Sequence, residues 1–320
     1  MNEKDFRRMM AVIKLHYQSG LSQDEIARRV YLSKSSVSRL IKKATELGYV
    51  EFKIKDPGQT VQGLQQELSD EFGAKCTVLP TYVDEYLVRL NDVCSYAAAE
   101  LENYIEDGGI VGVTWGRTTE YLANNLSKPL VPKKDVKVCM MSGFVTGTII
   151  SMKSTHIIEK MVDIFGAQGY VMPAPLLVDS SEIAQTLYSD SNIRFVADLS
   201  LRAQTVIVSV GGINLTDSLL TDRQSYNLSV YNKIAHSGGV GDIGGRNFDI
   251  YGQEVKTNIT DRIISLPLSE LKSKKHRICI AVGSHKTSAI LGALRGKLIN
   301  RLYTDEITAR DVLQEHKRCK

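Results

Sequence analysis

The sequence has few of the residues that would place it among secreted, zinc-binding or membrane-spanning proteins. Its five cysteines among 320 residues are scattered, odd in number and never spaced as C-x-x-C. This usage predicts reduced thiols in a cytoplasmic protein and argues against both a disulfide framework and a zinc site. Uninterrupted apolar runs stay well short of the ~20 residues that span a bilayer. The first ten residues mix acids with bases, so we expect no signal peptide there.

The remaining composition is that of a globular protein with unevenly distributed charge. Hydrophobic residues make up 43% of the chain and charged residues 24%, which allows a sizeable core. Residues 1–55 contain 12 Lys and Arg against 6 Asp and Glu, a net charge of +6, and the other 265 residues contain 28 against 30, a net of −2. This distribution predicts that a polyanion is attracted to the N-terminal part of the chain.

Residues 23–42, QDEIARRVYLSKSSVSRLIK, have the pattern of a two-helix DNA-binding unit. Ser33 is suited to cap the second helix, and the small Ala27 lets the two helices cross closely. Tyr31 departs from the usual pattern, because glycine is common at this turn and a left-handed backbone costs another residue on the order of 1 kcal/mol. The alternative is an ordinary helical hairpin with a solvated basic face. The positions that predict a shared core are Ile26, Ala27, Val30, Leu32, Val37, Leu40 and Ile41.

The outward positions of the second helix are short hydroxyls and long cations, which suit a helix that enters a major groove. We expect Ser35, Ser38 and Arg39 to face base edges, with Arg39 suited to guanine. The phosphate contacts are expected from Lys34, Lys42 and Lys43.

The chain is expected to divide into residues 1–56, a DNA-binding domain, and residues 57–320, an effector-binding and oligomerisation domain. A helix over 4–19 would complete a three-helix unit, and the alternation in 49–54, YVEFKI, predicts a short strand beside the helices. An apolar stripe in 59–72 predicts an amphipathic helix, either a coupling or dimer helix or one docked on its own domain.

The chain from Cys76 onward predicts an α/β fold, because apolar strand-like runs alternate with helical stretches. Such alternation favours a largely parallel sheet, and parallel sheets bind ligands beyond the carboxyl ends of their strands. The expected strands are 76–80, 110–114, 136–141, 169–172, 204–210, 277–282 and 299–303, and the expected helices are 85–106, 117–126, 155–165, 180–188, 192–201, 286–295 and 305–314.

The clearest ligand-side loop, GVTWGRTT, follows the strand expected at 110–114 and precedes a helix. Gly116 would allow close backbone approach, and the helix would present free N–H groups to an anion. Arg117 and Thr118 could add a charge-assisted bond and a hydroxyl, so we expect a phosphate or carboxylate here. A plain strand-to-helix connector is the alternative.

Other loops are expected at the same edge of the sheet. Ser142 and Gly143 follow the strand at 136–141. Met140 and Met141 stand at the end of that strand, where a Schiff base would require a lysine, so we expect reversible binding. The loop 211–214, GGIN, could close over a ligand or be a simple turn.

Two further stretches complete the expected site. Residues 238–249, GGVGDIGGRNFD, are so rich in glycine that we expect an irregular loop, with Asp242 as an acceptor for sugar hydroxyls. Lys286, in the GSHK stretch 283–286 before a helix, predicts a second cationic anion contact.

Three stretches of the chain resemble the sugar-binding domain of SorC-type transcriptional regulators. They are VGVTWGRTTEYLA, VGDIGGRNFDIYG and AVGSHKTSAILGALRGKLINRLYTDEITA, and residues 22–43 are similar to the family's N-terminal helix-turn-helix. The resemblance covers nearly the whole chain in the family's order. It is most specific in the glycine-rich and GSHK segments and least specific in residues 144–200.

The resemblance implies a cytoplasmic bacterial repressor or activator of a carbohydrate-related operon. Its effector domain would be Rossmann-like, folded as in sugar-phosphate isomerases and CoA transferases, and it would form dimers or tetramers that respond to a phosphorylated sugar or similar metabolite. No cofactor is implied. Carried over by position, the resemblance assigns effector contacts to Gly116, Arg117, Thr118, Ser142, Gly143, Asp242 and Lys286.

An enzyme with an appended DNA-binding domain, such as a sugar-phosphate isomerase or deaminase, is the rival hypothesis. That chemistry needs a positioned base near the anion site. Asp242 is a candidate, but the six histidines share no motif, and only His285 lies beside a candidate loop. A lone loop histidine more often serves as a hydrogen-bonding residue than as a catalyst, so the sequence favours a regulator. An assembly scaffold, a third possibility, would leave the concentrated basic charge near the N-terminus unexplained.

Overall fold

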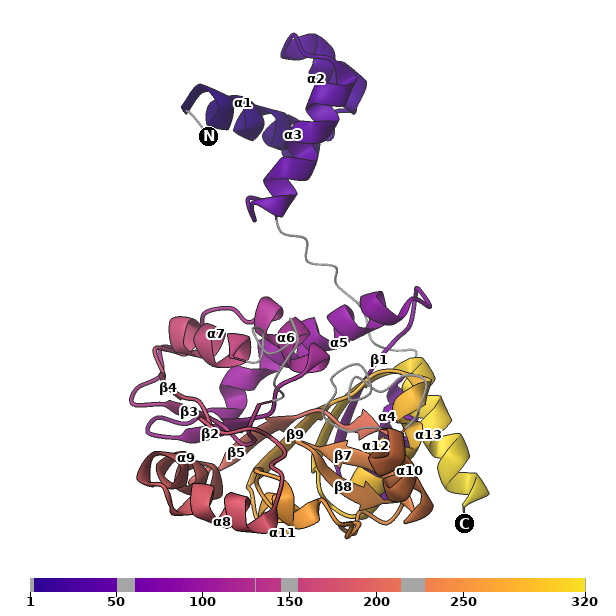
Figure 1. Ribbon diagram of the computed structural model, residues 1–320. Coiled ribbons are helices and arrows are strands. Elements are labelled where there is room, and N and C mark those ends of the chain that lie inside the picture. Colours follow the sequence, from indigo (N-terminus) through magenta and orange to yellow (C-terminus); the bar gives the residue numbers. More distant parts are fainter. Residues whose placement is uncertain (1–2, 51–60, 130, 145–154, 214–227, 320) are drawn as a thin grey trace. The chain divides into compact units, whose positions relative to one another are not determined.

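The computed structural model describes residues 3–50, 61–129, 131–144, 155–213 and 228–319. It divides into two compact units, Met1–Pro57 and Gly58–Lys320, which we call the head and the body. Each unit has its own hydrophobic core. We therefore describe each unit by itself (Figure 1).

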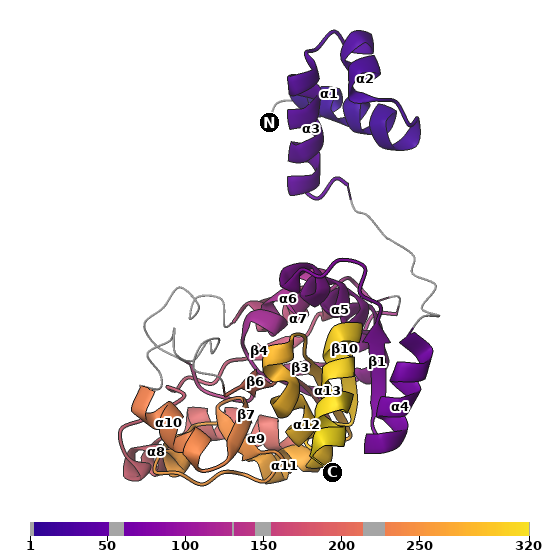
Figure 2. The same ribbon diagram turned by 90° about the vertical axis from the view of Figure 1, so that its right-hand side faces the viewer.

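The head is built from the three expected helices, α1 (Glu3–Ile13), α2 (Gln23–Arg29) and α3 (Lys34–Glu46), seen most clearly in Figure 2. A π-helical turn at Lys14–Gln18 extends α1, so the region predicted as one helix over 4–19 is helical to Gln18. Local caps explain the boundaries: Ser22 forms a reciprocal capping box at the start of α2, and the Ser33 hydroxyl accepts from a backbone N–H of α3. The core includes Val12, Ile26, Val37 and Ile41.

Tyr31 adopts the left-handed conformation that its place in the turn predicts, with φ of +54°. Tyr31 follows the last residues of α2, and the Leu32 N–H donates back to the Ala27 carbonyl at 2.9 Å. This is the helix-ending arrangement in which glycine is the usual residue.

The strand expected at 49–54 is not present in its described part. Tyr49 and Val50 lie outside any strand, and residues 51–54 lie outside the described residues. The Tyr49 N–H instead donates to the Ala44 carbonyl at 2.9 Å, and its ring packs edge-on against Phe6 at 5.5 Å. Tyr49 therefore closes the end of α3, which an alternating pattern alone could not reveal.

The body contains a seven-stranded sheet in which every strand pair is parallel, as the alternation of strands and helices predicts. The order across the sheet is β1-β10-β9-β5-β2-β3-β4. Fully buried runs such as IVGV in β2 and TVIV in β5 form its centre. The strands are β1 (Lys75–Leu79), β2 (Ile110–Val113), β3 (Lys137–Met140), β4 (Gln168–Tyr170), β5 (Thr205–Val208), β9 (His276–Ile280) and β10 (Arg301–Asp305).

Helices cover both faces of the sheet. Figure 1 shows α5, α6 and α7 along one face and α8, α9 and α11 along the other. This is the doubly wound arrangement expected when parallel strands are joined by helical crossovers. The helices are α4 (Gln62–Phe72), α5 (Tyr86–Glu100), η3 (Leu101–Tyr104), α6 (Arg117–Asn125), α7 (His156–Phe165), α8 (Ser181–Ser189), α9 (Ser191–Arg202), α10 (Leu228–His236), η5 (Thr260–Arg262), α11 (Leu268–Lys272), η6 (Ser284–Lys286), α12 (Thr287–Arg295) and α13 (Glu306–Arg318).

The amphipathic helix α4 packs on its own unit. Leu68 is fully buried against the body's core, and Glu71 bonds to His316 of α13 at 2.7 Å. The His316 ring also lies edge-on to Phe72, with 4.9 Å between the ring centroids. The docked alternative for this segment is therefore the one present in the structure.

The prediction of an irregular loop at 238–249 is wrong. This stretch forms two antiparallel strands, β7 (Gly239–Ile243) and β8 (Arg246–Asp249), joined by a tight turn. The GGIN stretch is also corrected, since Gly211–Gly212 forms strand β6 beside β7, while Asn214 lies outside the described residues.

Glycine is needed in these strands because they lie directly against other backbone. A Cβ added to Gly241 would come 2.4 Å from the Ala289 Cβ of α12, and one added to Gly212 would come 2.3 Å from the His285 carbonyl oxygen. Gly244 and Gly245 then supply the positive φ angles of the turn, +57° and +85°. The small sheet thus packs onto η6 and α12, and that contact fixes the GSHK stretch.

Candidate functional site

The exposed face of α3 carries every residue proposed to contact DNA. Helical spacing places them on one side of the helix, opposite the buried residues Val37, Ile41 and Ala44. The full set, Lys34, Ser35, Ser38, Arg39, Lys42 and Lys43, is exposed to solvent.

Their local partners are weak surface contacts. Lys34 pairs with Asp24 at 2.7 Å, Lys42 lies 3.9 Å from Glu46, and Arg39 Nε donates to the Ser35 carbonyl at 3.3 Å. Exposed pairs of this kind contribute little to stability and are easily exchanged for phosphate contacts. The α3 face can therefore bind a polyanion without disturbing the fold of the head.

In the body, three polar side chains converge from the segments that follow three different strands. The Lys286 amine donates to Ser209 Oγ at 3.1 Å and to Thr118 Oγ1 at 3.4 Å, and Ser209 Oγ donates to Thr118 Oγ1 at 3.2 Å. We call these three residues the lysine cluster. The structure thus joins two predicted site residues, Thr118 and Lys286, and adds Ser209, which sequence reasoning missed. Its signal was its place as the first polar residue after the apolar strand TVIV.

The topology explains why these loops meet. Thr118 follows β2, Ser209 follows β5 and Lys286 follows β9, and these three strands are neighbours in the sheet. The connection after β2 continues to β3 on one side, whereas the connection after β5 continues to β9 on the other. The order of the sheet therefore reverses between β2 and β5, and such a switch point is where open α/β sheets bind ligands.

Lys286 is a buried cation at this point, with 9% of its surface exposed. Burial is the main cause that lowers its pKa, the nearby Arg117 lowers it further, and Asp242 opposes the shift. Burial also raises the pKa of the Cys94 and Cys279 thiols to about 12, so both are neutral. Among the described residues no carboxylate lies within ion-pair distance of the Lys286 amine. An anion would supply the missing charge.

Gly116 and Arg117 frame the approach to this cluster. Gly116 precedes the first turn of α6 with φ of +150°, and a Cβ built on it would meet no atom of the described residues within 4 Å. The described side chains therefore leave the space beside its backbone open. Arg117 is exposed at the first position of α6, where the helix N-terminus favours negative charge.

Ser142 and Gly143 lie at the end of the adjacent strand β3. Ser142 is fully buried, and its hydroxyl has no hydrogen-bond partner within the described part of the chain. The Gly143 N–H donates to the Ile264 carbonyl at 2.9 Å, and its carbonyl accepts from Trp115 at 2.8 Å. Gly143 is thus engaged in packing, whereas the Ser142 hydroxyl is available to a hydrogen-bonding group.

Asp242 lies in β7 and is buried. One carboxylate oxygen accepts from the Gly245 N–H at 2.9 Å, which holds the β7–β8 turn, and the other lies beside the backbone of Gly211. Its charge raises the pKa of Lys286. Asp242 therefore stabilises the β7–β8 turn and also interacts electrostatically with Lys286 of the lysine cluster.

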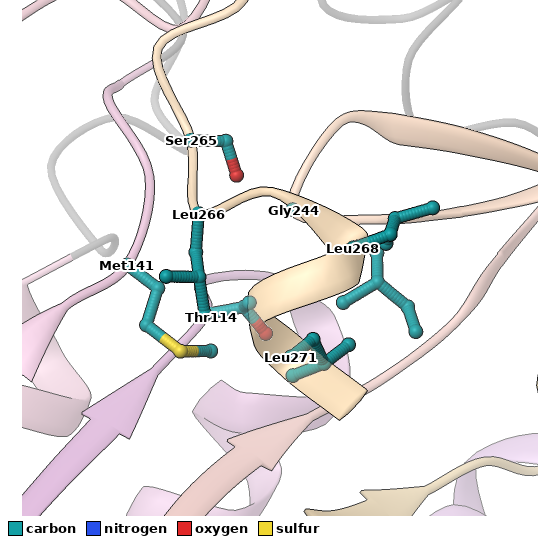
Figure 3. A pocket seen from close by; sticks show the side chains of 8 residues that line it. Thr114, Met141, Gly244, Ser265, Leu266, Leu268 and Leu271 are labelled. Atoms are coloured by element: carbon teal, nitrogen blue, oxygen red, sulfur yellow. The ribbon is translucent and has the colours of Figure 1, made fainter. Parts of the chain in front are cut away.

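A small pocket lies beside the β7–β8 turn, with Gly244 in its lining (Figure 3). Figure 3 shows Thr114 and Met141 on one side of it and Leu268 and Leu271 of α11 on the other. Ser265 borders the pocket, so hydroxyls occur within a mainly apolar lining.

The described residues contain neither a metal-binding cluster nor a membrane-spanning helix. No group of three or more His, Cys, Asp or Glu there is arranged to hold a metal ion. None of the helices found there has both the length and the apolarity to cross a membrane.

His285 packs its ring against Tyr86, with 5.6 Å between the ring centroids.

Models of known protein families match both the head and the body. The family model described as "Putative sugar-binding domain" matches residues 58–314, and the model of the MarR family matches residues 12–59. The first match covers most of the chain and coincides with the body. The second covers α2 and α3 of the head.

Two curated regulators are similar along nearly their whole length. The deoxyribonucleoside regulator of Bacillus subtilis is 30% identical, with 94% of this chain and 96% of the relative covered. The sorbitol operon regulator of Klebsiella pneumoniae is 26% identical, covering 98% and 99%. The crystal structure of the full-length sorbitol operon regulator SorC from Klebsiella pneumoniae has the same fold, with a TM-score of 0.76 at 24% identity over 98% of this chain and all of the other.

Proposed function

The chain belongs to the SorC-type family of sugar-binding transcriptional regulators, and on that premise we propose that a phosphorylated sugar, or a similar small anion, bound at the lysine cluster controls how tightly the head binds operator DNA. A helix-turn-helix head joined to a sugar-binding body is the organisation of a DNA-binding regulator of a carbohydrate-related operon. The phosphate, the contact residues and the assembly state are the parts that we propose.

The observation that supports this proposal most directly is a buried lysine at the switch point of the sheet. Lys286 meets two hydroxyls there and no carboxylate at ion-pair distance among the described residues. A phosphate could accept from Lys286 and from the first backbone N–H groups of α6, with Arg117 at the rim. Among the described residues, none fills the space beside the Gly116 backbone.

The remaining predicted contacts fit the sugar rather than its phosphate. We propose that Ser142 hydrogen-bonds a sugar hydroxyl, because its own hydroxyl is fully buried without a partner among the described residues. We propose that Asp242 acts chiefly through the β7–β8 turn and through its charge, and that Gly143 acts by allowing close packing.

The exposed face of α3 is proposed as the DNA contact. Arg39, Ser35 and Ser38 would read base edges, and Lys34, Lys42 and Lys43 would bind phosphates. A helix-turn-helix protein usually binds two half-sites about one DNA turn apart, so we propose a dimer or tetramer that works in the cytoplasm. Effector binding would change the spacing of the recognition helices by shifting the arrangement of subunits, a coupling typically worth 1 to 3 kcal/mol, about 5- to 150-fold in affinity.

We further propose that the body binds its effector without transforming it. Asp242 holds a turn and His285 packs on Tyr86, so neither of the two candidate bases is set aside for proton transfer. Both curated relatives named above are regulators.

Titration of an operator complex tests the proposal. An operator is selected from random duplex DNA with the full chain, and its complex is titrated with phosphorylated sugars, the matching free sugars and inorganic phosphate, with fluorescence anisotropy as the readout. At least one phosphorylated sugar should change operator affinity by 5- to 150-fold, and its free sugar should act far more weakly. The effector part of the proposal is wrong if every phosphorylated compound leaves operator affinity and oligomeric state unchanged.

A further inference from the structure

Tyr31 combines two features that are unfavourable within the head. Its backbone is left-handed, with φ of +54°, a conformation that favours glycine. Tyr31 is 93% exposed, the largest exposed fraction of any large apolar or aromatic residue in the described part of the chain. Asp135 and Lys297 share the positive φ, but their side chains are polar and lose nothing by facing water.

The Tyr31 side chain contributes nothing visible to the folding of the head. Within the described part of the chain, neither its ring nor its hydroxyl makes a hydrogen bond, ring contact or cation–π contact. Every other exposed tyrosine of the head does make one: Tyr49 packs on Phe6, and Tyr17 contacts His16. A strained, outward aromatic residue is therefore better explained by something outside the head.

The position of Tyr31 identifies that partner. It lies two residues before Ser33, which caps α3, and three before Lys34, the first cation of the exposed α3 face. When the N-terminal end of a recognition helix enters a major groove, the preceding turn lies near the sugar-phosphate backbone. A tyrosine hydroxyl is one of the common donors to backbone phosphates.

We infer that the Tyr31 hydroxyl donates a hydrogen bond to a backbone phosphate at the edge of each operator half-site. This inference rests on the proposed function, because it requires that α3 is the helix bound to DNA. The contact would be independent of sequence, since phosphates carry no base identity. It would also leave the salt dependence unchanged, because a neutral phenol that binds a phosphate releases no counterion.

Two substitutions in the full chain separate the hydroxyl from the backbone. Tyr31→Phe keeps the ring and removes only the donor, and should weaken binding to the selected operator and to random duplex alike by about 3- to 10-fold. The slope of log affinity against log salt should stay that of the wild type. Tyr31→Gly removes the strain as well as the side chain, so the thermal midpoint of the head should rise by about 4 °C while DNA affinity falls.

The control is Tyr251→Phe in the body, a tyrosine that is 63% exposed. It should leave DNA affinity unchanged. If Tyr31→Phe binds both DNAs as tightly as the wild type, the inference is wrong even though the wild type binds its operator. If Tyr31→Gly gains stability and affinity together, Tyr31 makes no useful contact. If the wild-type chain itself binds no duplex, the proposed function fails rather than this inference alone.

Discussion

The two regions proposed to bind anions use positive charge in opposite ways. The cations of α3 are exposed, and their partners are surface ion pairs such as Lys34 with Asp24. Lys286 of the body is buried, and its amine meets two hydroxyls, with no carboxylate at ion-pair distance in the described structure. One region displays several cations to solvent, and the other encloses one.

The difference teaches which kind of anion each region can recognise. Exposed cations attract a long polyanion from a distance and lose that attraction as salt increases. A buried lysine has already lost its hydration, so a small anion that fits beside it gains a strong and weakly screened interaction. The head is therefore suited to a duplex and the body to a metabolite.

Removing the buried charge should have the largest effect. Lys286→Met deletes the amine but keeps an unbranched apolar side chain, so the affinity for the active phosphorylated sugar should fall by about 10- to 100-fold. The unliganded variant should be at least as stable as the wild type, because a buried cation that lacks an ion pair costs free energy.

Isothermal titration calorimetry measures that affinity, and thermal unfolding without ligand measures stability. Lys256→Met, an exposed lysine of the same unit, is the matched control and should bind like the wild type. Equal binding by Lys286→Met would remove the lysine cluster from the site.

Raising the pH should weaken effector binding before an ordinary lysine would titrate. Burial lowers the pKa of Lys286 below 10.5, so the folded, unliganded protein loses this proton at a lower pH than the unfolded chain. Its cost to stability thus shrinks as pH rises from the lowered pKa towards 10.5, while affinity for a phosphate falls by up to about tenfold per pH unit.

A phosphate monoester is fully ionised above pH 8, so its own charge stays constant in this window. Calorimetry between pH 7.5 and 10 measures the effect, and Lys286→Met should lack it. Constant affinity of the wild type up to pH 10 would show that the charge of Lys286 is not used.

The frame of the body site should tolerate change poorly. Gly241→Ala places a Cβ 2.4 Å from that of Ala289, so we expect a loss of about 1 to 3 kcal/mol in the free energy of unfolding. Denaturant unfolding measures it, and the double variant Gly241→Ala with Ala289→Gly should recover part of the loss. Gly63→Ala, where a Cβ meets no described residue within 4 Å, is the control and should be neutral or slightly stabilising.

Single substitutions on α3 should each remove one DNA contact among several, and two of them should differ in kind. Arg39→Ala should lose about 1 to 3 kcal/mol of discrimination at one base pair of the operator. Lys42→Ala should weaken binding a few-fold to every sequence and reduce the salt slope by about 1. Anisotropy with the operator, its single-base variants and random duplex at several salt concentrations measures both. Equal losses on all duplexes for the two variants would contradict the assignment of Arg39 to a base.

Much of this arrangement could be predicted from local patterns. The strands β2, β5 and β9 are apolar runs that a buried parallel sheet requires, and the order of loops and helices placed Thr118 and Lys286 at one edge. The left-handed turn at Tyr31 followed from its place between two helices, since that position fixes the backbone whatever the side chain.

What the sequence could not supply depends on contacts between distant residues. The glycines of β7 indicated a loop because glycine is rare in strands, whereas in the structure close neighbours explain them: Ala289 lies against Gly241, and Ile234 lies against Gly239. Ser209 was missed because it fell inside the strand predicted at 204–210, whereas β5 ends at Val208. It joins the site because β5 lies between β2 and β9 in the sheet. The strand predicted from Tyr49 onward failed in its described part, because Phe6 and Ala44 hold Tyr49 at the end of α3.

The most direct test is a crystal structure of the full chain with the phosphorylated sugar that most changes operator affinity. The phosphate should lie at the N-terminus of α6, within hydrogen-bond distance of Lys286 Nζ, with the sugar reaching toward Ser142. A phosphate bound elsewhere, with Lys286 still bonded only to Ser209 and Thr118, would contradict the account.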